Sequence, residues 1–269
     1  MEKSKDKKME WTPSQDKAIK EIQAFIKNPD AKVFILTGSA GTGKTTLTKQ
    51  IIKELKNKKK SFTLLASTGR AAKVVQNATG ESCRTVHSLL YTFTGFNQDL
   101  EKLADNDTLP TDKHGQILLV FEAAPLPWPE RNEEWFYIID EASMISDTPD
   151  KGVHQAVFGS GCLLQDLFAF NPKGKYIFIG DICQLPPINS SNSPALTPDY
   201  IQAQYHLPVN NAELSEIVRQ KDSNDIIIAS QKLRSLYKNP PVCNWGKFPL
   251  KNFKHIKIHS SQADLIQAY

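Results

Sequence analysis

A glycine-rich turn near the N-terminus constrains this chain more than any other feature. Residues 38–45 read Gly-Ser-Ala-Gly-Thr-Gly-Lys-Thr, which matches the pattern G-x-x-x-x-G-K-[ST]. An apolar run at residues 33–36 precedes the turn, and apolar side chains at helical spacing follow it between residues 47 and 55. A strand, a glycine-rich turn and a helix in this order are typical of a phosphate-binding loop.

The chemistry of phosphate binding explains the residue types in this loop. Glycines let the backbone curl so that successive N–H groups point inward, and the following helix adds the positive end of its dipole. We expect Lys44 to reach the β- and γ-phosphates and Thr45 to place its hydroxyl on Mg²⁺. The predicted cofactors are therefore ATP and Mg²⁺, and the predicted nucleotide-binding residues of the loop are Gly38, Ser39, Ala40, Gly41, Thr42, Gly43, Lys44, Thr45 and Thr46.

A pair of acids follows another apolar run. Residues 137–139 read Tyr-Ile-Ile and lead directly into Asp140 and Glu141. At the carboxyl end of a buried strand, Asp140 can hold the Mg²⁺ shell opposite Thr45, and Glu141 can polarise an attacking water molecule. Acids in a solvated loop would be the ordinary interpretation of such a pair alone, but the phosphate-binding loop favours the catalytic one.

Short apolar runs alternate with helical patterns along most of the chain. The runs at residues 33–36, 62–66, 136–139 and 176–179 have the length and composition of buried strands. Strands that alternate with helices predict an α/β fold with a mainly parallel sheet and helices on both faces.

The places where this alternation of apolar runs and helical patterns begins and ends also predict domain boundaries. Residues 1–10 are polar and predict a flexible leader, while 11–90 and 135–235 carry the α/β pattern. Residues 91–134 are loop-rich and predict a small inserted subdomain. Residues 236–269 form a C-terminal extension.

Composition excludes several classes of protein. No apolar run reaches the ~18 residues of a membrane-spanning helix, and the first residues carry no secretory signal pattern. The net charge of +4 is mildly basic and allows a local basic groove. The four cysteines are scattered, which supports neither a zinc site nor a disulfide framework. We expect a cytoplasmic protein without membrane contact.

Two of the motifs carry a family resemblance. Asp140-Glu141-Ala142-Ser143-Met144 and Gly180-Asp181-Ile182-Cys183-Gln184-Leu185-Pro186-Pro187 resemble motifs II and III of superfamily I helicases of the RecD-like and Dda-like branch. Segments 12–15, 67–73, 85–90 and 214–220 resemble the Q-motif and motifs Ia, Ib and IV, in family order. The resemblance implies a RecA-like P-loop NTPase domain with a small inserted 1B-like wedge. It further implies the first motor domain of a helicase that moves five-prime to three-prime on single-stranded DNA.

The same resemblance implies roles around the nucleotide. Gln15 would contact the adenine edge, although its position in the sequence Thr-Pro-Ser-Gln also predicts a capping box at a helix start. Gln184 would sense the γ-phosphate or the attacking water, and Arg219 would place its guanidinium on the γ-phosphate. With the loop and the acids, the implied catalytic residues are Lys44, Glu141, Gln184 and Arg219.

A second set of residues would contact single-stranded DNA. Small hydroxyls and backbone N–H groups suit phosphate contacts that do not read sequence. The implied DNA-binding residues are Thr68, Gly69, Arg70, His87, Ser88 and Phe121. Three of them have alternatives: His87 could be a core histidine, Arg70 could only stabilise the fold, and Phe121 could either stack on a base or belong to the core of its own strand.

The motor of this family needs a second RecA-like domain, for which the sequence contains no motif. No arginine follows Arg234, so a second arginine finger has no candidate. We therefore expect the second motor domain of the same full-length chain as a partner and weak hydrolysis by this segment alone.

Two other classes of function stay open on the sequence alone. A P-loop kinase or signalling NTPase unrelated to DNA would need an acceptor site, and single-stranded DNA would not stimulate its hydrolysis. A module that binds DNA or a partner without turnover would keep its affinity when Lys44 is replaced.

Overall fold

The computed structural model describes residues 10–96, 119–123, 134–149, 156–188, 190–218 and 225–238. The chain divides into two compact units, Met1–Glu216 and Ile217–Tyr269. The first unit holds every described strand, and the second holds helix α7 (Asp225–Lys238). Most of the predicted extension 236–269 lies outside the described residues. None of the described helices is long and apolar enough to span a membrane.

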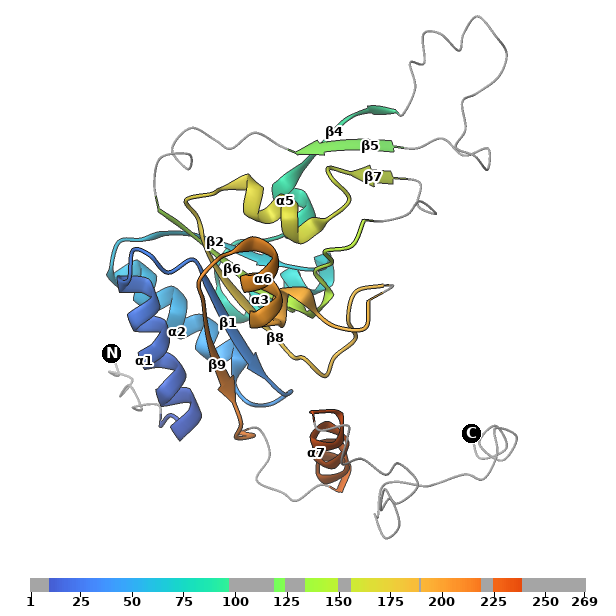
Figure 1. Ribbon diagram of the computed structural model, residues 1–269. Coiled ribbons are helices and arrows are strands. Elements are labelled where there is room, and N and C mark those ends of the chain that lie inside the picture. The colour runs from blue at the N-terminus through green and yellow to red at the C-terminus, as the bar shows by residue number, and fades with distance from the viewer. Residues whose placement is uncertain are drawn as a thin grey trace, which may run out of the picture. The chain divides into compact units, whose positions relative to one another are not determined.

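The first unit is built on a six-stranded sheet in which every pair of neighbours is parallel. The strand order is β3-β2-β6-β8-β1-β9, so β8 lies between β6 and β1 (Figure 1). The strands are β1 (Val33–Gly38), β2 (Ser61–Ala66), β3 (Cys83–Thr85), β6 (Trp135–Asp140), β8 (Lys175–Gly180) and β9 (Val209–Leu214).

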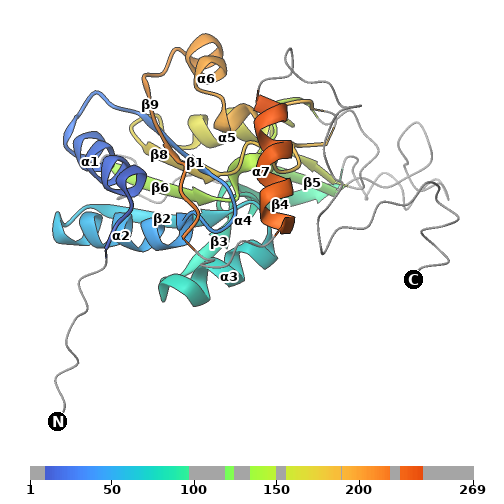
Figure 2. The same cartoon turned by 90° about the horizontal axis from the view of Figure 1, so that it is seen from below.

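Alternate side chains of the central strands enter two separate cores. Phe34, Ile138 and Ile177 pack with helices on one face, and Ile35, Ile139 and Phe178 pack on the other. Figure 2 shows α2 and α3 on one side of the sheet and α5 and α6 on the other. Because both faces are buried, these strands are apolar throughout, which confirms the expected α/β architecture. The first face is covered by α1 (Pro13–Lys27), α2 (Lys44–Asn57) and α3 (Gly69–Thr79), and the second by α4 (Val86–Leu90), η2 (Ala142–Met144), α5 (Leu163–Phe170), η3 (Pro194–Leu196) and α6 (Pro198–Tyr205).

A second, three-stranded sheet stands apart from the first. Its strands are β4 (Tyr91–Phe96), β5 (Leu119–Ala123) and β7 (Ala156–Phe158). β4 and β5 pair antiparallel, and β7 pairs parallel to β5. Two strands therefore belong to the segment 91–134 in which a subdomain is expected, and the third comes from a later part of the chain.

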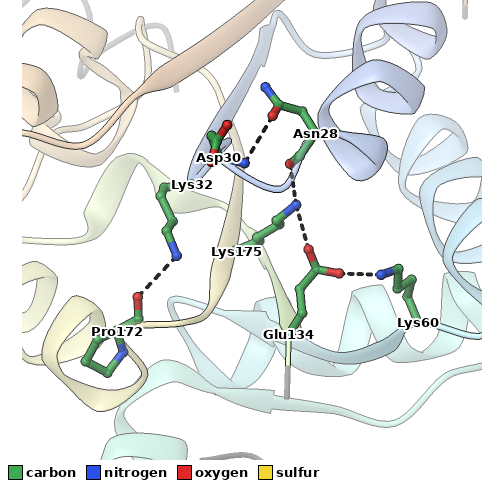
Figure 3. A network of polar contacts seen from close by, with 7 residues as sticks. All are labelled: Asn28, Asp30, Lys32, Lys60, Glu134, Pro172 and Lys175. Atoms are coloured by element: carbon green, nitrogen blue, oxygen red, sulfur yellow. Dashed lines mark hydrogen bonds and ion pairs between the residues drawn. The ribbon is translucent and has the colours of Figure 1, made fainter. Parts of the chain in front are cut away.

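Charged side chains meet at the edge of the large sheet where its strands begin (Figure 3). Lys175 is only 1% exposed, yet its Nζ donates to Asn28 O (2.6 Å) and pairs with Glu134 Oε1 (2.7 Å). Glu134 also pairs with Lys60 (2.5 Å), while the Lys175 ammonium lies over the rings of Phe25 and Phe136. The buried charge is therefore fully partnered, as burial of an ammonium group requires.

Candidate nucleotide-binding site

The glycine-rich turn connects β1 to α2 at the edge where the strands of the large sheet end. Gly43 caps α2 with φ +91°, a left-handed conformation that favours glycine. A Cβ on Gly43 would lie 2.5 Å from Gln15 Nε2, and one on Gly38 would lie 2.6 Å from Thr42 Oγ1. Both glycines are therefore required by close approach, and Gly43 also by its backbone conformation.

Lys44 begins α2, as the motif predicts, and its ammonium group turns back over the loop. Its Nζ donates to Gly38 O (2.9 Å) and Ser39 O (3.1 Å). Thr45 and Thr46 follow in the first turn of the helix and are half-buried. The N-terminal N–H groups of α2 and the lysine charge thus meet at one place, which suits an anion.

The predicted acids lie two strands away at the same edge of the sheet. Asp140 ends β6 and is 6% exposed, and its Oδ1 accepts from Glu141 N (2.9 Å). Burial raises the pKa of Asp140 to about 6, and the positive charge of Lys44 acts in the opposite direction. The parallel pairing of β1 and β6 with β8 puts the loop and the acid at the same edge of the sheet. Since strands in a sheet are spaced about 4.8 Å apart, β6 and β1 lie about 10 Å from each other.

Glu141 has a backbone conformation that is rare outside glycine. Its φ is +51° and ψ +42°, in the left-handed region, and it precedes the short helix η2. A non-glycine residue in this region carries local strain, which is found most often at functional sites. The backbone turns at Glu141, whose side chain is half-buried, while that of Asp140 is buried.

Residues of β8 and the loop after it lie between the acids and the phosphate-binding loop. Asp181 directly follows β8, is 4% exposed, and accepts from Cys183 N through Oδ1 (2.9 Å). Sequence reasoning assigned Asp181 no role, although it has the signal that singled out Asp140, an acid at the end of an apolar strand. Gln184 is exposed, and its N–H donates to Asp181 O (3.1 Å).

Gln15 links the start of α1 to the phosphate-binding loop. The predicted capping box is present: Thr12 Oγ1 accepts from Gln15 N, and Gln15 Oε1 accepts from Thr12 N (3.0 Å). Gln15 Nε2 donates to Thr42 O (2.9 Å), and the side chain is 4% exposed. The contact of Gln15 with the adenine edge stays a prediction.

Magnesium fits the residues at this edge of the sheet. No group of three histidines, cysteines or acids in the described ranges could hold a metal alone. Mg²⁺ typically binds one or two protein oxygens together with phosphates and water, so the Thr45 hydroxyl and the buried Asp140 carboxylate suffice beside a nucleotide.

Some of the residues predicted to contact DNA lie at the same edge of the sheet, where β2 ends. Thr68, Gly69 and Arg70 follow β2 and are all exposed, and Thr68 Oγ1 caps α3 by accepting from Ala71 N (3.2 Å). Their position at the strand end places them beside Asp140, because Ala66 pairs with Asp140 in the sheet.

His87 and Ser88 lie on α4. Burial lowers the pKa of His87, whose ring packs against Tyr91 (5.7 Å between centroids) and Phe158 (5.2 Å). Ser88 is exposed, and its Oγ accepts from Arg84 Nε (3.3 Å) and donates to Thr85 O (2.9 Å). His87 is therefore tied to the second sheet, while Ser88 and Arg84 form a polar pair at the surface.

The Phe121 ring packs against aromatic rings of the two neighbouring strands of the second sheet. Its ring stacks on Phe158 (4.7 Å, 21°) and meets Phe93 edge-on (5.4 Å). Phe93 is 47% exposed and lies on the neighbouring strand. Arg219 lies outside the described residues.

Comparison with known proteins identifies the family of the chain. A family model described as an AAA domain matches residues 10–238. The chain belongs to this family. The ATP-dependent RecD2 DNA helicase of Deinococcus radiodurans is 28% identical over 233 residues, which are 86% of this chain and 25% of that protein. These matches confirm the predicted resemblance to RecD-like helicases and the RecA-like P-loop class of the fold.

Two further similarities complete the comparison. An uncharacterized protein of Methanocaldococcus jannaschii is 28% identical over 229 residues, 82% of this chain and 16% of that protein. The crystal structure of Pif1 helicase from Candida albicans aligns with a TM-score of 0.48 at 23% identity, covering 84% of this chain and 44% of that one. The chain spans a quarter or less of the length of the two curated relatives.

Proposed function

We propose that this AAA domain family member binds ATP with Mg²⁺ and is the first motor domain of a DNA helicase that translocates five-prime to three-prime on single-stranded DNA. One observation carries the proposal: β1 and β6 both pair in parallel with β8, so the phosphate-binding loop after β1 and Asp140 at the end of β6 lie at the same edge of the sheet. The similarity to RecD2, an ATP-dependent DNA helicase, supports the extension to DNA.

The residues at the sheet edge divide the work of hydrolysis. The N–H groups of residues 38–46 and the Lys44 ammonium would hold the phosphates. Thr45 and Asp140 would hold Mg²⁺, which when bound would supply positive charge beside the transferring phosphoryl group. Glu141 orients the attacking water and accepts its proton. Gln184, which is exposed in the loop after β8, senses the γ-phosphate.

An arginine adds to this charge stabilisation. We propose that Arg219 contacts the γ-phosphate and that a second RecA-like domain of the full-length protein supplies a further arginine. Arginine fingers contribute roughly 10³–10⁵ in rate, so we expect the 269-residue chain to bind ATP well and hydrolyse it weakly.

The DNA path follows the exposed residues at the ends of β2 and β3. Thr68, Gly69 and Ser88 offer hydroxyl and backbone groups for phosphate oxygens, and Arg70 adds a positive charge. His87 supports this surface through its ring contacts with the second sheet. In that sheet Phe121 backs the exposed Phe93, so we propose that the two rings together form the face of the 1B-like wedge.

The free cysteines Cys83, Cys162 and Cys183 support a reducing compartment, and we propose the cytoplasm.

Nucleotide binding and DNA-stimulated hydrolysis test the proposal. Lys44→Ala should lower ATP affinity and abolish hydrolysis, because it removes the only ammonium group that the motif places on the phosphates. Lys53→Ala, an equal loss of charge at an exposed position of the same helix, should leave both unchanged. Fluorescent ATP titration and phosphate release, each with and without a single-stranded oligonucleotide, provide the readouts.

The outcomes separate the competing functions. DNA-stimulated hydrolysis in the full-length protein that depends on Lys44 supports a motor. Hydrolysis that DNA does not affect, together with phosphate transfer to an acceptor, would indicate a kinase or signalling NTPase. DNA affinity that is identical with and without nucleotide, in both the wild type and Lys44→Ala, would indicate a binding module.

A further inference from the structure

A carboxylate at the end of β9 is bonded to the start of α1, two segments that are about 200 residues apart in sequence. Glu216 Oε2 accepts from Thr12 Oγ1 (3.1 Å) and from Ser14 Oγ. Ser215 N donates to Ser14 Oγ (3.3 Å). The residues that follow β9 are thus held by the two hydroxyls of the helix start.

The same helix start is bonded to the phosphate-binding loop. Thr12 N donates to Gln15 Oε1 (3.0 Å), and Gln15 Nε2 donates to Thr42 O (2.9 Å). Gln15 and Thr42 are buried and Thr12 is half-buried, so water competes weakly for these bonds. A continuous series of hydrogen bonds therefore runs from Glu216 to the loop, and we call it the Glu216 relay.

Glu216 lies at the boundary between the two compact units of the chain. Glu216 is the last residue of the first compact unit, and the second begins at Ile217. The strand before it is fixed beside the loop as well, because Leu214 pairs with Gly38 in the sheet. A shift of the Thr42 carbonyl on nucleotide binding has a direct route to the residue at which the chain leaves the first unit.

We propose that Glu216 is a positioning residue that couples nucleotide binding at the phosphate-binding loop to the segment beginning at Ile217. The proposal rests on the proposed nucleotide-binding function. Three hydrogen bonds connect Glu216 to the loop, by way of Thr12 and Gln15, and Ser14 holds the same carboxylate. Coupling between two sites is reciprocal. If bound nucleotide strengthens the hydrogen bonds of Glu216 to Thr12 and Ser14, loss of these bonds weakens nucleotide binding by the same factor.

The test compares four single variants of the 269-residue chain, and Ser14→Ala is also combined with Glu216→Ala. Glu216→Ala removes the acceptor, Glu216→Gln keeps an acceptor oxygen, and Glu10→Ala removes a carboxylate at an exposed position two residues before Thr12. The readouts are affinity for a fluorescent ATP analogue, thermal unfolding, and amide hydrogen exchange of residues 209–218 with and without that analogue.

We expect Glu216→Ala to bind the ATP analogue roughly threefold to tenfold more weakly, the effect of losing one or two partly exposed hydrogen bonds. Nucleotide should slow exchange at residues 215–218 in the wild type and not in Glu216→Ala. Glu216→Gln should recover most of both effects, and Glu10→Ala should match the wild type. Ser14→Ala should not add to the loss in Glu216→Ala, since both remove the same bond.

Each contrary outcome has a distinct meaning. If the wild type fails to bind the ATP analogue, both the proposed function and the relay are wrong. If the wild type binds but Glu216→Ala shows the same affinity and the same protection, only the relay is overturned. A fall in affinity that accompanies a large fall in unfolding temperature, and that Glu216→Gln does not recover, would show a merely structural role and would also overturn it.

Discussion

Single residues in the phosphate-binding loop are constrained by close contacts as much as by phosphate chemistry. Gly43 has φ +91°, and a side chain there would collide with the Gln15 amide, whereas Gly80 has φ +75° with open space around its Cα. A side chain at Gly80 would introduce backbone strain alone, whereas one at Gly43 would introduce both strain and a collision. Strain in the left-handed region alone costs roughly 1–2 kcal/mol for an L-residue.

This contrast predicts different results for the same substitution. Gly43→Ala should destabilise the fold by about 1–3 kcal/mol and weaken nucleotide binding, because it displaces Gln15 from Thr42 O. Gly80→Ala should lower stability by about 1 kcal/mol and leave nucleotide affinity unchanged. Urea unfolding and nucleotide titration measure the two effects, and wild-type affinity in Gly43→Ala would refute the role given to the Gln15 contact.

The strands of the large sheet have different polar groups at their two ends. The strands end at the candidate nucleotide site, while β6 and β8 begin at the Lys175–Glu134–Lys60 network (Figure 3). Burial raises the pKa of Glu134, but hydrogen bonds and charges from Lys175 and Lys60 outweigh it and hold the pKa below its usual value. A carboxyl group with a depressed pKa contributes stability above its unfolded pKa and loses it as the pH falls through its folded pKa.

The network thus predicts a pH-dependent contribution to stability. At neutral pH, Glu134→Gln should be about 1.5–3 kcal/mol less stable than the wild type, since hydrogen bonds to charged groups have this strength. The difference should shrink as the pH falls below 4.5, the ordinary value for glutamate. Urea unfolding across this pH range checks it, with Glu10→Gln as an exposed control. A difference that is constant with pH would show that the Glu134 charge is not responsible.

At the scale of the whole molecule, one sheet carries the candidate nucleotide-binding site and separates the two cores of the first unit. Ligand binding at the ends of the central strands should therefore stabilise the entire first unit. ATP with Mg²⁺ at ~100 times its dissociation constant should add about 2.7 kcal/mol, which raises the unfolding temperature by roughly 5–10 °C for a protein of this size. Circular dichroism with a slowly hydrolysed ATP analogue measures the shift, and an equal shift in Lys44→Ala would place binding elsewhere.

Much of the fold could be predicted because its signals are local. The apolar runs around residues 34, 64, 138 and 178 are strands, and the capping box of Thr12 and Gln15 starts α1 as expected. Strands β4 and β7 of the small sheet were not predicted. For β7, three residues carry too little periodicity, and its partner strand is more than thirty residues earlier.

The sequence by itself determined that a phosphate-binding loop lies between a buried strand and a helix, and that an acid pair ends another strand. These features depend on residue types at fixed spacing, which local geometry translates directly into structure. Only the tertiary structure decided that β8 lies between β6 and β1, which places Asp181 in the site, and that Glu216 meets Thr12 and Ser14. Strand order and contacts between distant segments result from packing of the whole chain, and no local pattern encodes them.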